Sequence, residues 1–90
     1  MKLSYDPAKD ARNAQERGLS FERVYEFDFD TAIIRPDLRF AYPEPRFVAT
    51  GFIGERLHVV CYTPAVDGIR IISLRKANAR ELARYEKEKS

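Results

Sequence analysis

A short stretch that is apolar on both of its faces constrains the fold of this chain more than any other feature. Residues 57–63 read Leu-His-Val-Val-Cys-Tyr-Thr and lie between two turn-forming segments, Gly54-Glu55-Arg56 and 64–68. Side chains alternate between the two faces of a strand, so a strand that is apolar on both faces must be covered on both. We therefore predict that residues 57–63 form a central strand of a sheet.

Other extended segments lie on either side of this central strand. The short stretch 2–5, the β-branched run 31–35 and the stretches 46–53 and 69–75 are typical of strands. Residues 36–45 are rich in proline and read as a connection between two of them. The short loops favour neighbouring antiparallel strands, so we expect an antiparallel meander of about four strands.

The first helix is marked at both ends. Asp6 followed by Pro7 is a strong start signal, with Asp as the N-cap and Pro at the first helical position. Gly18 marks the end of this helix. Its sequence is mostly polar, so we expect a surface helix with only Ala11 and Ala14 facing inward.

Two further helices are predicted from their caps. Ser20 precedes a short helix over residues 21–27, and Asn78 with Glu81 forms a capping-box pattern at the start of a final helix. Tyr85 falls on the apolar side of that last helix. The order of helices, strands and a closing helix predicts an α+β fold, and ninety residues are enough for a single domain over 1–90.

Composition narrows the class of protein. The chain has 16 basic and 14 acidic residues, so its net charge of +2 does not by itself indicate a nucleic-acid partner. The single cysteine, Cys61, allows no internal disulfide, which suits a reducing cytoplasm. It reads as a buried core residue. We see no signal peptide and no membrane-spanning run, and we expect no membrane association.

Two arginines in the last predicted strand are the sharpest functional feature. Arg70 and Arg75 are five residues apart in an otherwise apolar segment. Guanidinium groups fixed on a sheet suit the recognition of phosphodiesters, although either arginine alone is as easily a structural ion pair. Strand alternation places them on opposite faces unless a bulge intervenes.

Three further side chains are candidates for proton transfer or phosphate binding beside these arginines. Arg46 begins a strand just after Glu44, a possible general base that is equally well explained as the partner in a surface ion pair. His58 is the only histidine and is a candidate proton shuttle, although a strand histidine more often has a structural role. Tyr85 can donate a proton or simply pack its helix onto the sheet.

The remaining basic residues predict a phosphate-binding surface or, more simply, a solvated one. The candidates for RNA contact are Lys9, Arg12, Arg17, Arg23 and Lys76. With one histidine and one cysteine, the common zinc sites are nearly excluded, and no glycine-rich phosphate loop is present. We therefore expect no metal and no cofactor.

The order of these segments resembles the BrnT family of bacterial type II toxins. The matching pieces are Tyr5-Asp6, Gly18-Leu-Ser-Phe21, Arg46-Phe47 and Arg70-Ile-Ile-Ser-Leu-Arg75-Lys-Ala77. The last piece is the most specific. Where the family usually has Lys-His-Gly, this chain has Glu16-Arg17-Gly18, so no catalytic histidine is transferred to Arg17.

The resemblance implies a RelE-like fold and a ribonuclease that arrests growth by cutting RNA. It also implies neutralisation by a BrnA-like antitoxin with a ribbon-helix-helix DNA-binding part, so that operator DNA is reached only through the antitoxin. Cleavage through the RNA 2′-hydroxyl needs no metal, and Arg46, Arg70 and Arg75 are expected to bind the scissile phosphate. The alternative is a catalytically inactive toxin relative that acts as an RNA-binding or complex-forming module.

Overall fold

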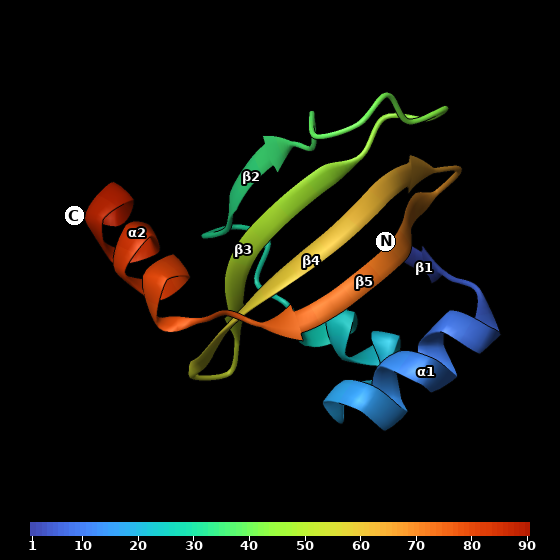
Figure 1. Cartoon of the computed structure of the whole chain (residues 1–90), viewed down its shortest axis with the longest axis horizontal. Coiled ribbons are helices and arrows are strands. Elements are labelled where there is room, and N and C mark those ends of the chain that lie inside the picture. Colours follow the sequence, from blue (N-terminus) through green and yellow to red (C-terminus); the bar gives the residue numbers. More distant parts are fainter.

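A five-stranded mixed sheet organises the chain, which the computed structural model describes from Met1 to Ser90 (Figure 1). The elements in chain order are β1 (Lys2–Ser4), α1 (Pro7–Arg17), the 3₁₀ helix η1 (Phe21–Glu26), β2 (Ile33–Pro36), β3 (Phe47–Ile53), β4 (Arg56–Ala65), β5 (Gly68–Lys76) and α2 (Ala79–Lys89). The strand order is β1-β5-β4-β3-β2. The predicted α+β class is confirmed.

The sheet differs from the prediction at one edge. β2 to β5 form the expected antiparallel meander, but β1 joins it as a fifth strand that runs parallel to β5. Lys2 lies opposite Gly68, where a side chain would overlap the Lys2 carbonyl oxygen at 1.9 Å. The missing side chain of Gly68 therefore allows the close approach of β1, which local sequence signals did not reveal.

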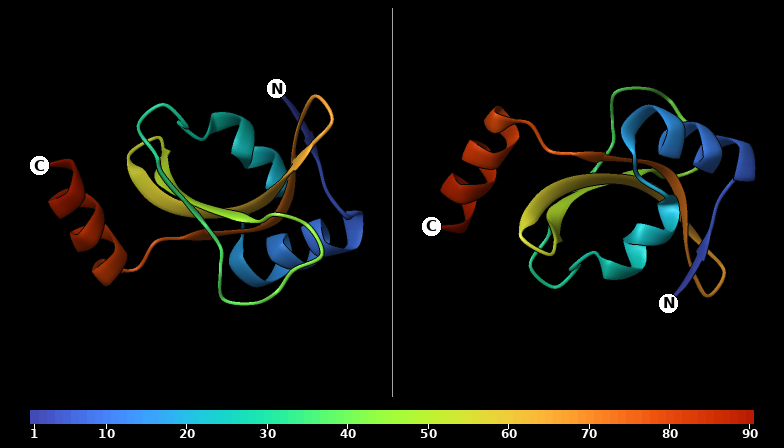
Figure 2. Two further views of the ribbon diagram at one scale, coloured as in Figure 1. Left: turned by 90° about the horizontal axis from the view of Figure 1, so that it is seen from above. Right: turned by 90° about the horizontal axis from the view of Figure 1, so that it is seen from below.

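β4 lies in the middle of the sheet, as predicted. Its residues from Leu57 to Thr63 are all buried, and they are covered by different elements on the two faces. Figure 2 shows the sheet curving around η1, while α1, α2 and the connection from β2 to β3 lie on the outer side of the curve. The inner face carries the main core, which includes Phe21, Val24, Val60, Ile71 and Leu74.

α1 forms as its caps predict but is oriented differently. Asp6 accepts a hydrogen bond from the Ala8 amide, and Gly18 ends the helix in a left-handed conformation. Ala11 and Ala14 are exposed, so the expectation that they face inward was wrong. The buried residue is Asn13, whose amide nitrogen donates to the carbonyl oxygens of Leu19 and Leu74, each at 2.9 Å.

α2 closes the far end of the outer face. Its predicted capping box is present, because Asn78 and Glu81 each accept from the other's backbone N–H. Tyr85 is buried with Leu57 and Val59 in a second, smaller cluster, and its hydroxyl donates to the Thr31 carbonyl at 2.9 Å. None of the helices has the length and apolar character needed to cross a membrane.

Candidate nucleic-acid interface

A bulge in β5 brings Arg70 and Arg75 to the same face of the sheet. Cys61 pairs with Ser73 and the next residue, Tyr62, pairs with Ile71, so Ile72 is the extra residue. Arg75 lies opposite Val59 and Arg70 opposite Thr63, two residues of β4 that share a face. The bulge therefore reverses the alternation between the two arginines.

This outer side of the sheet carries four arginines, and we call it the arginine face. It comprises Arg35 on β2, Arg46 at the start of β3, and Arg70 and Arg75 on β5. The register puts Arg46 beside Thr63, two strand spacings or about 10 Å from Arg70. Arg75 is about 13 Å further along, four strand rises of about 3.3 Å. The backbone positions of these three arginines therefore form an elongated row, which we call the track, and do not surround one point.

The three predicted phosphate-binding arginines differ in how they are held. Glu44 accepts from the Arg46 Nε at 3.0 Å. Glu81 accepts from both terminal nitrogens of Arg75, each at 2.7 Å, and these bonds raise the pKa of Arg75 and lower that of Glu81 to about 2. Arg70 is exposed and has no carboxylate within ion-pair distance. It is therefore the freest cation of the three.

A fifth arginine, which the sequence reasoning missed, lies over this face. Arg39, in the connection between β2 and β3, donates its Nε and Nη2 to the two carboxylate oxygens of Asp37, each at 2.9 Å. The Asp37 side chain is only 2% exposed, while that of Arg39 is 70% exposed. The connection that carries Arg39 lies on the outer side of the sheet, over the arginine face (Figure 2). The only signal in the sequence is an acid two residues before an arginine.

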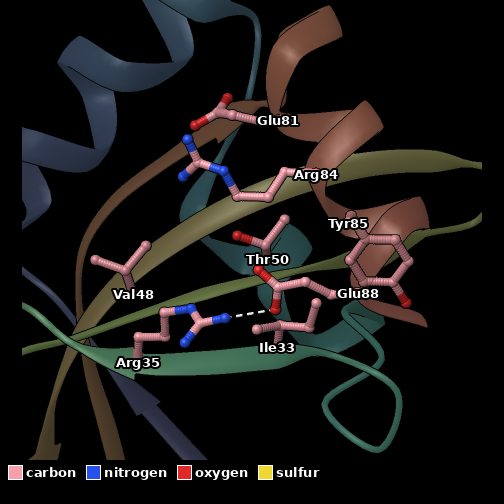
Figure 3. Close-up of a pocket in the computed structure, with 8 residues that line it drawn as sticks. All are labelled: Ile33, Arg35, Val48, Thr50, Glu81, Arg84, Tyr85 and Glu88. Carbon is pink, nitrogen blue, oxygen red and sulfur yellow. Dashed lines mark hydrogen bonds and ion pairs between the residues drawn. The ribbon is translucent and has the colours of Figure 1, made fainter. Parts of the chain in front are cut away.

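α2 and the edge of the sheet enclose a pocket of about 150 Å³ at the end of the arginine face (Figure 3). Arg35 and Arg84 line it together with Glu81 and Glu88, and Arg35 is paired with Glu88. The acids of α2 thus face the cations of the sheet. The part of the arginine face around Arg70 therefore has no carboxylate of α2 beside it.

His58 lies on the other face of the sheet. It shares the side of Val60, is 3% exposed, and its Nδ1 is 2.8 Å from the Arg56 carbonyl oxygen. Burial lowers its pKa, so the ring is predominantly neutral at pH 7. The structure therefore does not bring His58 together with Arg46, Arg70 and Arg75, because His58 is two positions from Val60 and so shares its face.

Two other predicted side chains have structural contacts. Tyr85 packs edge-on against Phe52 with ring centroids 5.4 Å apart, and its hydroxyl is bonded to the Thr31 carbonyl. Cys61 is on the arginine face but is buried, and burial raises the pKa of its thiol. These environments agree with a packing role for Tyr85 and a protonated thiol at neutral pH.

The basic residues proposed for RNA contact fall into two groups. Lys9, Arg12 and Arg17 are exposed on α1 and line a cavity of about 200 Å³ that also includes Ser73, which is on the arginine face. Arg23 pairs with Glu26 on η1, and both Arg23 and Lys76 lie near His58. The basic side of α1 therefore extends the arginine face, whereas Arg23 and Lys76 do not.

The side chains that could bind a metal ion do not form a cluster. The structure contains no group of three or more His, Cys, Asp and Glu side chains close enough to hold one ion.

Comparison with known proteins gives a family. Residues 5–81 match the model of the family described as "Ribonuclease toxin, BrnT, of type II toxin-antitoxin system". No curated protein matches the chain. The matched region runs from the end of β1 into α2 and contains every arginine of the sheet face.

Proposed function

The chain belongs to the BrnT family of ribonuclease toxins of type II toxin–antitoxin systems, and on this basis we propose that it arrests growth by cutting RNA. The observation that carries the proposal is the bulge at Ile72, which gives Arg70 and Arg75 a common face with Arg46. Fixed guanidinium groups on a rigid sheet are well suited to holding a phosphodiester in line and to stabilising its extra negative charge. We also propose that the fold is RelE-like.

The proposed reaction uses the RNA 2′-hydroxyl as nucleophile. Attack on the adjacent phosphorus forms a cyclic phosphate, and the bond to the 5′-oxygen of the next nucleotide breaks. The proton of the 2′-hydroxyl passes to a general base, and the leaving 5′-oxygen takes a proton from water to become a 5′-hydroxyl. Arg70 has no competing carboxylate, so we assign it to the scissile phosphate, with Arg46 beside it. Arg75, further along the track, is assigned to a neighbouring phosphate. Glu44 is assigned as the general base, because its carboxylate is 38% exposed next to Arg46.

Single alanine variants test the proposal in a bacterial growth-arrest assay. Loss of a charge-assisted bond to phosphate costs about 1.5–3 kcal/mol, so Arg70→Ala should lower the rate of RNA cleavage by roughly 10- to 100-fold. Arg46→Ala and Arg75→Ala should also reduce toxicity. Lys87→Gln on α2 removes an exposed charge that does not line the pocket and serves as the control. Full toxicity in all three alanine variants rejects the assignment.

Metal independence is a separate part of the proposal. Cleavage of total RNA by the purified chain should be unchanged by excess EDTA, because no step assigned above uses a metal ion. The products should carry a cyclic phosphate and a free 5′-hydroxyl. Loss of activity in EDTA that returns on adding a divalent cation would replace the guanidinium mechanism with a metal-assisted one.

We propose a BrnA-like ribbon-helix-helix protein as the antitoxin, with operator DNA bound only through that partner. Support comes from the family, since a type II system pairs a toxin with an antitoxin. Co-expression with the product of the adjacent gene should restore growth. The purified pair should bind its operator fragment, and the toxin chain alone should not.

A catalytically inactive, RNA-binding relative is the second candidate. One observation favours it: Glu44 and Glu81 already neutralise Arg46 and Arg75. This candidate predicts RNA binding without cleavage and without growth arrest. The assays above separate the two.

A further inference from the structure

The connection between β2 and β3 is ordered by contacts among its own side chains, and it carries an exposed aromatic ring. Asp37 accepts from the Arg39 backbone amide and side chain and from the Tyr42 hydroxyl, and its own amide donates to the Arg46 carbonyl at 2.8 Å. These bonds close the connection into a small structured unit. Phe40, inside it, is nevertheless 69% exposed.

Three side chains of this unit form a continuous stack next to the arginine face. The Arg46 guanidinium lies 4.1 Å from the centre of the Tyr42 ring, and the Tyr42 and Phe40 rings meet edge to face at 5.8 Å. The connection that carries Arg39 lies on the outer side of the sheet (Figure 2), which is also the side of Arg75. A cavity of about 410 Å³ lies along the unit, within the range of about 300–1,000 Å³ found for small-ligand sites.

We propose that this connection is a subsite for one unpaired nucleotide of the RNA, with its base stacked on Phe40 and its phosphate bound by Arg39. The inference deepens the proposed function by extending the arginine face to a nucleotide beyond the scissile bond. An exposed aromatic ring beside an exposed guanidinium group suits single-stranded nucleic acids, because every base has a stacking face and every nucleotide a phosphate. Arg39 is already held by both oxygens of the Asp37 carboxylate, so its side chain loses little conformational freedom when it binds a phosphate.

The groups that the subsite exposes favour RNA over a protein partner, because the Arg39 side chain is 70% exposed while the carboxylate that pairs with it is buried. Phe40 follows Arg39 in the chain and its ring meets the Tyr42 ring edge to face, and the buried carboxylate of Asp37 holds the unit together. Asp37 is thus a positioning residue that acts through Arg39. Leu38, 83% exposed on the same connection, is the feature that a protein partner would use instead, and its substitution separates the two cases.

The test uses a short single-stranded 2′-O-methyl oligoribonucleotide that contains 2-aminopurine. This probe cannot be cut through its 2′ position, and its fluorescence falls when the base stacks. We expect quenching with the unmodified chain, binding about 10-fold weaker and no quenching with Phe40→Leu, and near-normal behaviour with Phe40→Tyr. Val66→Ala, which alters an 89% exposed apolar residue at the tip of the β4–β5 hairpin, is the matched control.

Asp37→Asn tests the positioning role. It removes the charge that holds Arg39 but keeps a similar shape, so probe binding should weaken about 3- to 10-fold while quenching by Phe40 persists. Circular dichroism confirms that each variant is folded. If Asp37→Asn fails to fold, the Phe40→Leu and Phe40→Tyr pair still decides the proposal.

The outcomes separate this inference from the proposed function. RNA cleavage by the unmodified chain together with equal probe binding by Phe40→Leu overturns the subsite and leaves the nuclease intact. Quenching without any cleavage keeps the subsite and rejects the nuclease. A third outcome favours a protein interface and overturns the subsite. In that case Phe40→Leu and Leu38→Ala bind the probe as the unmodified chain does, but both bind the adjacent gene's protein more weakly.

Discussion

The side-chain amide of Asn13 connects α1 to two other parts of the chain. It is 8% exposed and donates to Leu74 on β5 and to Leu19 in the loop after the helix. The Leu74 carbonyl belongs to the stretch of β5 beyond the residues paired with β1. The polar side chain of Asn13 thus attaches α1 to the sheet, whereas the sequence predicted that Ala11 and Ala14 would do so by apolar contact.

Replacing Asn13 should destabilise the fold measurably. Asn13→Ala leaves two carbonyl oxygens without their donor, and each buried unsatisfied group costs about 1–3 kcal/mol, so we expect a loss of about 2–4 kcal/mol. Urea unfolding followed by circular dichroism measures it. Gln15→Ala, on the exposed side of α1, is the control and should change stability by less than about 0.5 kcal/mol. Equal midpoints for the two variants would contradict the role assigned to Asn13.

Residue-level features were the hardest to predict from the sequence. Helical periodicity suggested Ala11 and Ala14 as the inward side of α1, because apolar residues usually mark a buried stripe. The bulge at Ile72 has no local signal, since isoleucine there continues an ordinary strand pattern. Both features depend on contacts with residues distant in the chain, which propensity and periodicity do not contain.

At the scale of elements, α2 is attached by a small number of defined contacts. Glu81 serves twice, in the capping box and in the paired bonds to Arg75, and Glu88 pairs with Arg35. Tyr85 supplies the buried apolar contact. Glu81 therefore couples the start of the helix to the arginine face.

A glutamine at position 81 separates these two functions. Gln also completes a capping box, so Glu81→Gln removes the charge pair and keeps the cap. The pKa of Glu81 is about 2 in the folded chain against an ordinary 4.5, so its stabilising effect is present above about pH 4.5 and is lost as the pH falls toward 2.

The parent chain should thus be more stable than Glu81→Gln at pH 7, and the difference should shrink between pH 4.5 and pH 2. Urea unfolding of both proteins across this pH range provides the measurement. Asp37 also has a lowered pKa, but it is present in both chains and cancels in the difference. A difference that stays constant with pH would show that the pair does not stabilise the fold.

The elements themselves were largely predictable. The caps at Asp6, Gly18 and Asn78 located both ends of α1 and the start of α2, because each end needs a specific local partner for its free backbone groups. Strand limits differed by one or two residues. The pairing of β1 with β5 was not predictable, since Lys2 and its partner Gly68 are 66 positions apart in the chain (68 − 2).

For the whole molecule, the distribution of charge matters more than its sum. The net charge is only +2, and of Arg39 and the arginines of the arginine face only Arg70 has no carboxylate partner, with the basic side of α1 beside it. Single-stranded RNA bound there should release about 0.7 counterions for each phosphate that the protein neutralises.

Salt dependence measures this footprint. For the 2′-O-methyl oligoribonucleotide, the slope of log binding constant against log salt should become less steep by about 0.7 in Arg70→Ala. Lys87→Gln should leave the slope unchanged, because Lys87 is exposed on α2 outside the pocket. Equal slopes for the parent chain and Arg70→Ala would remove Arg70 from the set of phosphate contacts.

Because β5 contains an extra residue, the face on which each of its arginines lies depends on the length of the strand. Deleting Ile72 would restore plain alternation and send either Arg70 or Arg75 toward the apolar side occupied by Val60 and Leu74, without altering any charged residue. Two chains with the same arginines but one residue more or fewer between them would therefore present different surfaces. In relatives of this protein, the number of residues between these arginines is as informative as their identity.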